Sequence, residues 1–263
     1  MSWPLFEHLD GVAWRLAANR QVVLFLDFDG TLAPIVERPE LAHLPPETRA
    51  LLHQLARQPG VTVSIISGRS LPDIQARVGL DALIYAGNHG LEIGGPGLHF
   101  VQPEAALQRP ALQRLAGALA TQLRHFTGVA VEDKGLSLSI HVRRAQPADH
   151  NKIARLVQAS LAAFPGLALA AGKMVLEIRP AVAWNKGSAV GWISAALAKK
   201  QALAICLGDD RTDEDAFAAL PEGITIKVGP AEASAARYHL NGPAEVRFFL
   251  AWLARALEGH ISG

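Results

Sequence analysis

A chain of 263 residues can bury the core of one large α/β domain or of two modest ones. Its 25 Lys and Arg residues nearly balance 24 Asp and Glu residues, and a net charge of +1 does not mark the chain for nucleic acid or an anionic membrane. The single cysteine, Cys206, excludes an intramolecular disulfide framework and fits a reducing compartment. No apolar run approaches the roughly 20 residues of a membrane span, and the first ten residues lack the pattern of a secretory signal. We therefore expect a cytoplasmic monomer that binds neither nucleic acid nor membranes.

The first predicted elements are an amphipathic helix over residues 3–19 and a buried strand that ends in two carboxylates. Val22–Leu26 is a continuous apolar run, which is typical of a parallel strand covered on both faces by helices. Asp27 and Asp29 follow, and Gly30 lets the chain turn away at once. Two anions at a buried strand end are costly unless a cation joins them, so the spacing predicts a hard divalent metal with oxygen ligands. An acidic Asp-Gly turn without a metal is the simpler alternative.

The next predicted elements are a small hairpin or flap over residues 33–40, a helix from Pro46 to about Gln58 and a strand over Val61–Ile66. Ser67 and Gly68 stand at the end of that strand. A hydroxyl and free backbone amides at a strand-to-helix junction form a natural phosphate cradle, although a serine there is more often only a turn residue.

Ser70 and Asp73 have the spacing of a capping box and predict the start of the following helix. Another short strand, ALIYA, leads to a glycine-rich turn that carries Asn88 and His89. Either side chain could face a substrate, but a turn with a hydrogen-bonded histidine is the commoner arrangement. After Phe100 the long buried strands stop, and residues 106–180 read as helix, two strands, helix and two strands. This pattern predicts a separate insert.

The predicted strands of the insert alternate between apolar and polar residues. In residues 136–143, Leu, Leu, Ile and Val share one face, while Ser, Ser, His and Arg share the other. Residues 173–179 alternate similarly, with Val175 as the exception. A solvated sheet face explains this alternation. A surface of this kind, joined by Glu132 and Lys134, also suits a polyhydroxyl ligand, because carboxylates accept from sugar hydroxyls and cations donate to them.

A lysine at a helix start is the third informative feature. Asn185 predicts a helix N-cap and places Lys186 in the first turn, where the helix dipole disfavours a cation. The misplaced charge makes sense if Lys186 meets an anion, although a solvated lysine would tolerate the small cost.

A second acidic pair follows the predicted strand Ala202–Leu207. Thr212 and Asp215 predict the capping box of the next helix, which leaves Asp209 and Asp210 before the cap at a strand end. These two carboxylates complete a plausible oxygen site for Mg2+. Cys206 lies inside the strand and is most simply a small core residue.

Taken in order, these features resemble the motifs of the haloacid dehalogenase superfamily of phosphotransferases. The resemblance covers about residues 20–100 and 180–230, and the insert is similar to the larger cap domain of that superfamily's sugar phosphatases. Within this group, YAGNHG, EDKG and GDDRTDEDAF resemble the trehalose-6-phosphate phosphatases. The resemblance implies a Rossmann-like α/β core with a parallel sheet, residues 1–105 and 181–263, and a smaller inserted α/β cap, residues 106–180.

The resemblance also implies an activity, the Mg2+-dependent hydrolysis of trehalose 6-phosphate through an aspartyl-phosphate, and a role for each matching residue. The implied catalytic residues are Asp27 as nucleophile, Asp29 as general acid and base, and Ser67 and Lys186 as phosphate ligands. The implied metal ligands are Asp27, the backbone carbonyl of Asp29, and Asp209, with Asp213 and Asp210 orienting Lys186 or the water around the metal. The implied substrate-binding residues are Gly68, Arg69, Asn88, His89, Glu132, Lys134, Arg143, Lys173 and Glu177.

Three alternatives stay open. A sister phosphatase would act on sucrose 6-phosphate or a glycosyl-phosphoglycerate. A phosphomutase would depend on a bisphosphate sugar and release no net phosphate. A non-catalytic module would bind a sugar phosphate without turnover, but the complete acid and base set at Asp27 and Asp29 argues against it.

Overall fold

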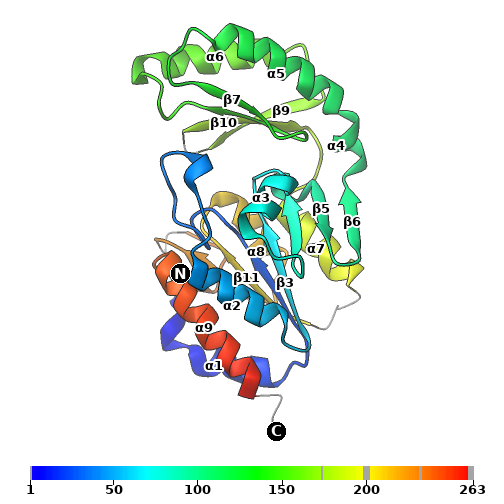
Figure 1. The fold of residues 1–263 in the computed structure, drawn as a ribbon, viewed down its shortest axis with the longest axis vertical. Helices are drawn as coiled ribbons and strands as arrows, with labels where there is room; N and C mark the ends of the chain where they lie inside the picture. The colour runs from blue at the N-terminus through cyan, green and yellow to red at the C-terminus, as the bar shows by residue number, and fades with distance from the viewer. Residues whose placement is uncertain (1, 173, 198–201, 231–232, 260–263) are drawn as a thin grey trace. The chain divides into compact units, whose positions relative to one another are not determined.

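The chain folds into two compact units in the computed structural model, which describes all residues except 1, 173, 198–201, 231–232 and 260–263 (Figure 1). Unit 1 comprises Met1–Phe100 and Trp184–Gly263, and unit 2 comprises Val101–Ala183. The expected insert, residues 106–180, lies within the limits of unit 2. Across the described residues, no helix has the length and apolar character that crossing a membrane requires.

A single mostly parallel sheet forms the centre of unit 1. Over the described part of the chain, its strands in spatial order are β1 (Trp3–Pro4), β13 (Tyr238–Leu240), β12 (Ile224–Val228), β11 (Leu203–Gly208), β2 (Val22–Leu26), β3 (Val61–Ile66), β4 (Ile84–Gly87), β5 (Glu92–Gly95) and β6 (Leu98–Val101). In this spatial order, each strand from β1 through β13, β12, β11, β2 and β3 to β4 is parallel to its neighbours. β5 pairs antiparallel with β4. This arrangement places the carboxyl ends of β2, β3 and β11 at one edge of the sheet.

Helices cover both faces of this sheet. The helices and 3-10 turns of unit 1 are η1 (Leu5–Glu7), α1 (Leu9–Ala17), η2 (Pro39–Leu41), α2 (Pro46–Ala56), α3 (Leu71–Val78), η3 (Asn88–Gly90), α7 (Lys186–Ala196), α8 (Arg211–Ala218) and α9 (Pro243–Gly259). Apolar residues of α1, α2, α3 and α9 pack into one buried cluster, and those of α7 and α8 pack into another. Unit 1 is therefore a three-layer α/β sandwich, and the predicted Rossmann-like fold class is confirmed.

The central strand β2 shows why its sequence is a continuous apolar run. All five of its residues are buried. Val22, Leu24 and Leu26 belong to one core cluster, while Val23 and Phe25 belong to the cluster on the opposite face. Because side chains alternate between the faces of a strand, only a strand buried on both faces needs apolar residues at every position.

The N-terminal region of unit 1 differs from the prediction. Residues 3–19 were expected to form one helix, but Trp3 and Pro4 pair with β13, and α1 begins only at Leu9. The expected hairpin over residues 33–40 is also wrong: besides the turn η2, this region carries an isolated bridge between Asp29 and Ala33. Two prolines in that segment limit ladder hydrogen bonding, since proline has no N–H to donate.

Unit 2 contains a second sheet covered by two helices. Its strands, in spatial order, are β7 (Ala130–Asp133), β8 (Leu138–His141), β10 (Val175–Pro180) and β9 (Leu167–Gly172), and all neighbours are antiparallel. Its helices and 3-10 turn are α4 (Pro103–Leu107), α5 (Arg109–Leu123), η4 (Pro147–Asp149) and α6 (His150–Leu161). Leucines of α5 pack with Ile153 and Val157 of α6 on the apolar face of the sheet. The predicted succession of helix, two strands, helix and two strands is confirmed.

Candidate active site

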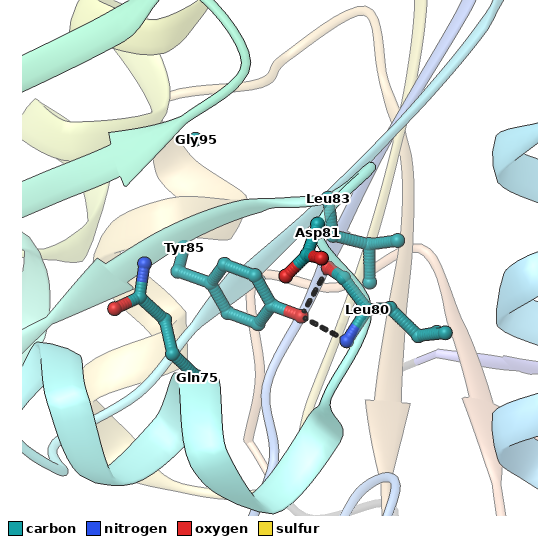
Figure 2. Close-up of a pocket in the computed structure, with 6 residues that line it drawn as sticks. All are labelled: Gln75, Leu80, Asp81, Leu83, Tyr85 and Gly95. Atoms are coloured by element: carbon teal, nitrogen blue, oxygen red, sulfur yellow. Dashed lines mark hydrogen bonds between the residues drawn. The ribbon is translucent and has the colours of Figure 1, made fainter.

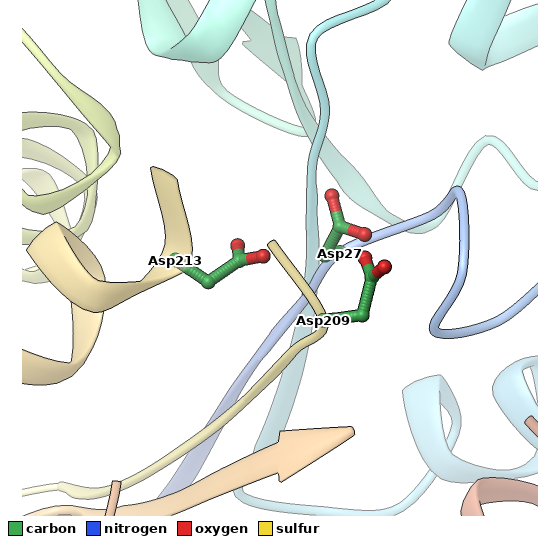
Figure 3. Close-up of side chains that lie close together, drawn as sticks. All are labelled: Asp27, Asp209 and Asp213. Atoms are coloured by element: carbon green, nitrogen blue, oxygen red, sulfur yellow. The ribbon is translucent and has the colours of Figure 1, made fainter. Parts of the chain in front are cut away.

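The carboxyl ends of β2 and β11 bring three carboxylates together. These strands are parallel neighbours with Leu26 opposite Leu207, so Asp27 and Asp209 follow at the same edge. Asp213, from the first turn of α8, faces both (Figure 3). One oxygen of each carboxylate lies within 4.8 Å of the other two. The two acidic pairs of the sequence therefore contribute to one cluster.

Lys186 lies against this cluster. It begins α7 after the predicted N-cap Asn185, and only 2% of the residue is exposed. Its Nζ donates to Oδ1 of Asp27 at 2.7 Å and to Oδ1 of Asp213 at 2.6 Å. Burial alone would lower the pKa of Lys186, but the two carboxylates outweigh it and raise this pKa, so the ammonium stays charged. The cation at the start of the helix thus meets anions.

The formal charges of this group do not balance. Burial raises the pKa of Asp27, Lys186 opposes the rise, and the neighbouring Asp213 and Asp209 add to it. Three carboxylates and one ammonium sum to −3 + 1 = −2. A divalent cation would offset this charge, and oxygen donors are the ligands that Mg2+ prefers. The donor set therefore fits a magnesium ion.

Two glycines leave room for the carboxylates. A Cβ atom on Gly30 would overlap the carboxylate of Asp209, and a Cβ atom on Gly208 would overlap that of Asp213. Gly30 also has a positive φ of 89°, which an L side chain rarely adopts. The glycine that turns the chain after Asp29 is therefore also required by the packing of the acidic cluster.

Asp29 lies outside the cluster and pairs with Arg69. Nε and Nη2 of Arg69 each donate to one oxygen of Asp29 at 2.7 Å. Nη1 of Arg69 donates to Asp73 at 2.9 Å, and Nε of Arg77 donates to the same carboxylate. Burial would lower the pKa of Arg69, but the hydrogen bonds that Arg69 donates to Asp29 and Asp73, and the charges of these carboxylates, raise it. The sequence offered Arg69 as a substrate ligand and gave no indication of this pairing.

The other predicted residues of unit 1 gather beside β3 and β4. Ser67 is 1% exposed, and its hydroxyl accepts from the backbone N–H of Arg69 at 3.2 Å. Asn88 and His89 both have a positive φ, 49° and 57°. Asn88 donates to Glu92 at 2.8 Å, and the His89 ring packs where a Cβ atom of Gly68 would lie. Two strained residues in one turn are costly, which is typical of a functional loop.

The predicted start of α8 is wrong. The helix begins at Arg211, and Asp210 is its N-cap, with Asp213 completing the capping box. Asp213 Oδ2 accepts from the backbone N–H of Asp210 at 3.0 Å, while its Oδ1 accepts from Lys186. The sequence analysis placed the capping box at Thr212 and Asp215, two positions later than the structure has it. The carboxylate of Asp210 thus caps the helix, whereas Asp213 belongs to the acidic cluster.

Lys227 is a residue near the cluster that the sequence analysis missed. Its Nζ donates to the backbone carbonyl of Asp209 at 2.6 Å. A signal was available: Lys227 is the one charged residue in the strand sequence ITIKV, whose other four residues are buried.

Two candidate ligand residues of unit 2, Glu132 and Glu177, lie on one sheet face. Glu132 and Glu177 both pair in register with Ser139, so the three side chains share a face. Glu132 pairs with His141 at 2.8 Å, and Glu177 pairs with Arg179 and, at 3.9 Å, with Lys134. Arg143 is exposed, and Lys173 lies outside the described residues.

A separate pocket lies beside α3. Its volume is about 250 Å³, and it is lined by Gln75, Leu80, Asp81, Leu83, Tyr85 and Gly95 (Figure 2). The Tyr85 hydroxyl donates to the Leu80 carbonyl at 2.7 Å, and burial raises the pKa of Tyr85 to about 12. The pocket shares no residue with the acidic cluster.

Comparison with known proteins agrees with this geometry. Residues 25–244 match the trehalose-phosphatase family. A trehalose 6-phosphate phosphatase of Zea mays is 36% identical over 259 residues, which cover 90% of this chain and 71% of the maize protein. A trehalose-phosphate phosphatase of Mycobacterium tuberculosis is 39% identical over 257 residues, which cover 94% of this chain and 65% of the mycobacterial protein.

Solved structures show the same fold. The C-terminal domain of a trehalose-6-phosphate phosphatase from C. albicans superposes with a TM-score of 0.80 at 25% identity and covers 97% of this chain and 98% of that domain. A haloacid dehalogenase-like hydrolase from Bacteroides thetaiotaomicron shares the fold at a TM-score of 0.61 and 15% identity, with coverage of 90% and 98%. The match over residues 25–244, together with these relatives, shows that the chain belongs to the trehalose-phosphatase family.

Proposed function

We propose that this chain is a Mg2+-dependent phosphatase that hydrolyses trehalose 6-phosphate to trehalose and phosphate. The observation that carries the proposal is the acidic cluster of net formal charge −2 at the strand ends, in which Asp27 and Asp213 are buried and Lys186 is bound to Asp27. Family membership and the activities for which its relatives are named supply the reaction class and the substrate. As a small-molecule enzyme with a single cysteine, the chain would act in the cytoplasm as a monomer.

In the proposed reaction Asp27 is the nucleophile. Its carboxylate oxygen forms a bond to phosphorus while the bond from phosphorus to the sugar oxygen breaks, and Asp29 gives its proton to that oxygen. Water then attacks the aspartyl-phosphate, Asp29 takes a proton from the water, and phosphate leaves with Asp27 restored. Two easier displacements thus replace one difficult hydrolysis.

The other residues of the site would hold the phosphate and the metal. Lys186 and Ser67 would donate to phosphate oxygens from the starts of α7 and of the turn after β3. The side chains of Asp27 and Asp209 and the backbone carbonyl of Asp29 would hold Mg2+. Asp213 would orient the groups around it and is itself held by the backbone N–H of Asp210. Bound Mg2+ would screen the repulsion between the Asp27 carboxylate and the phosphate dianion.

Within each unit, a set of residues is proposed to bind the substrate. In unit 1 the residues proposed to contact the sugar phosphate are Gly68, Arg69, Asn88 and His89. In unit 2 they are Glu132, Lys134, Arg143, Lys173 and Glu177. Carboxylates can accept from sugar hydroxyls and cations can donate to them, which supports this proposal. Glu132 and Glu177 also share one sheet face, and Lys134 lies 3.9 Å from Glu177.

The test is phosphate release from trehalose 6-phosphate, sucrose 6-phosphate, a glycosyl-phosphoglycerate and glucose 6-phosphate, each with Mg2+ and with a chelator. We expect strong, metal-dependent release from trehalose 6-phosphate alone. Equal release from several sugars would refute the substrate assignment and leave the catalytic residues in place. Dependence on a bisphosphate sugar without net phosphate release would indicate a mutase, and binding without turnover would indicate a binding module.

A further inference from the structure

Lys227 occupies an unusual place for a charged residue. It lies in β12, between β11 and β13, with Gly208 opposite it on one side and His239 on the other. The other four residues of β12 are buried, and 15% of the Lys227 side chain is exposed. A lysine in a central strand loses hydration of its ammonium, so it needs partners that compensate.

The first partner of Lys227 is the main chain next to the acidic cluster. Its Nζ donates to the backbone carbonyl of Asp209 at 2.6 Å. Asp209 lies in the turn between β11 and α8, and its carboxylate oxygen lies within 4.8 Å of those of Asp27 and Asp213. A peptide held at its carbonyl has a restricted orientation, which in turn restricts where the side chain of that residue points.

The second partner of Lys227 is Glu214 in the first turn of α8. The distance from Nζ to Oε1 of Glu214 is 3.9 Å. Glu214 is itself held by the Ser234 hydroxyl at 2.9 Å and by the backbone N–H of Ala235 at 2.7 Å. Because Glu214 offsets the charge of Lys227, the lysine acts on Asp209 as a hydrogen-bond donor more than as a positive charge.

Gly30 limits Asp209 from the other side. A Cβ atom at Gly30 would overlap the Asp209 carboxylate, so this side chain fits closely against the turn after β2. Lys227 fixes the backbone of Asp209, and Gly30 bounds the space for its carboxylate.

We propose that Lys227 is a positioning residue for the divalent-cation site. Lys227 holds the Asp209 carbonyl, so that the Asp209 carboxylate faces Asp27 and Asp213. Glu214, fixed by Ser234 and Ala235, holds Lys227 in this position. The inference rests on the proposed function, since it takes Asp209 as a metal ligand. Neither Lys227 nor Glu214 contacts the substrate in this role.

The test measures Mn2+ binding to the full chain without substrate, from the electron paramagnetic resonance signal of free Mn2+. The variants are Lys227→Met, Lys227→Arg and, as a matched control, Lys152→Met, whose lysine pairs at 3.2 Å with Asp149 in unit 2 and is 69% exposed. We expect Lys227→Met to weaken Mn2+ binding by about tenfold or more, as is common when a group that orients a metal ligand is removed. Lys227→Arg keeps a donor and should restore most of the affinity, and Lys152→Met should match the wild type.

A kinetic measurement separates positioning from a general structural role. In Lys227→Met the Mg2+ concentration for half-maximal phosphate release should rise by the same factor, while KM for the sugar phosphate at saturating Mg2+ stays unchanged. Unchanged Mn2+ affinity would overturn the inference. Tighter Mn2+ binding would also overturn it, because a lysine that acted only as a like charge would repel the cation.

Three further outcomes are decisive. If Lys227→Met does not fold, Glu214→Gln replaces it: loss of the compensating charge should weaken Mn2+ binding by a smaller factor, and unchanged affinity refutes the inference. A wild-type chain that binds Mn2+ but releases no phosphate refutes the proposed function, while the binding data still test Lys227. A wild-type chain that binds no Mn2+ refutes the inference itself.

Discussion

The guanidinium of Arg69 holds both oxygens of the Asp29 carboxylate, each at 2.7 Å. Such a two-point pair fixes the plane of the carboxylate as well as its position. Arg69 is fixed in turn by Asp73 on α3, and its guanidinium lies 5.5 Å from the centre of the Phe28 ring. The group that we propose as acid and base is therefore anchored to a helix next to the strand end that carries the nucleophile. Both of its oxygens accept from Arg69 here, so Asp29 must leave this pair before it can give a proton to the sugar oxygen.

Asp29→Asn should separate the two halves of the reaction. With p-nitrophenyl phosphate the first step needs little proton donation, because the aryl oxygen is a good leaving group, but water attack still needs a base. We expect a burst of p-nitrophenol equal to the enzyme concentration, followed by a steady rate about 10² to 10⁴ times below wild type. With trehalose 6-phosphate no burst should occur. Asp10→Asn on α1 is the control, and a variant that loses both phases equally on the aryl substrate would contradict this role.

Asp27→Asn should abolish phosphate release without unfolding the chain. The amide cannot attack phosphorus, but it keeps the shape of the side chain. It also removes one negative charge from a site where burial, and then the neighbouring Asp213 and Asp209, raise the pKa of Asp27. The free energy of unfolding in urea should therefore not fall markedly. Turnover near the wild-type rate would exclude Asp27 as nucleophile.

Gly30→Ala and Gly97→Ala form a matched pair. Both glycines have a positive φ, 89° and 71°, so each alanine should cost about 1–2 kcal/mol of stability. A Cβ atom at Gly97 meets no atom within 4 Å, whereas one at Gly30 overlaps Asp209. We expect Gly30→Ala alone to lower Mg2+-dependent activity, by about tenfold or more, because it displaces a proposed metal ligand. Equal activity in the two variants would show that the contact with Asp209 is unimportant.

Asp73 gives a prediction for pH. Burial would raise the pKa of Asp73, but hydrogen bonds from Arg77 and Arg69 outweigh it and lower the pKa in the folded chain. The stabilisation is therefore complete above the unfolded value of about 3.9 and is lost as the pH falls through the lower folded value. Asp73→Asn should cost about 1 kcal/mol at pH 7, a figure discounted for partial exposure, and progressively less below pH about 4. A difference in urea stability that grows on acidification would contradict this assignment.

Glu177→Ala should affect the disaccharide substrate selectively. Removal of this carboxylate from the face that also carries Lys134 should raise KM for trehalose 6-phosphate, because a buried hydrogen-bonding group is lost. Hydrolysis of p-nitrophenyl phosphate should change little. Glu104→Ala on α4 is the matched control in the same unit, and equal losses on both substrates would rule out Glu177 as a sugar ligand.

Much of the fold was predictable because buried elements require apolar residues in a regular pattern along the sequence. β2 and β3 appear in the sequence as apolar runs, and N-caps at Ser70 and Asn185 mark the starts of α3 and α7 where the structure has them. Parallel strands place their carboxyl ends at one edge, so strand-end carboxylates indicated a shared site before their distances were known.

The rest depends on contacts between distant residues, which a pattern cannot specify. Arg69 and Asp29 are 40 positions apart. Lys227 of β12 is 18 positions from Asp209, which lies in the turn after β11. For α8, the pattern DDRTDED contains two capping boxes, and the Asp210 register is the one in which Asp213 also reaches Lys186. Tertiary pairing, which acts beyond local propensity, thus decides the register.

Phe100 and Trp184 stack with their ring centres 5.1 Å apart, and Trp192 of α7 packs 4.6 Å from Phe100. Phe100 is the last residue of unit 1 before unit 2, and Trp184 is the first residue of unit 1 after it. The chain therefore leaves unit 1 and returns to it at two residues whose rings are in contact. Trp184 Nε1 also donates a hydrogen bond to the Gly90 carbonyl at 2.8 Å. A fold closed in this way can carry a different segment between Phe100 and Trp184 without a change in the order of its strands.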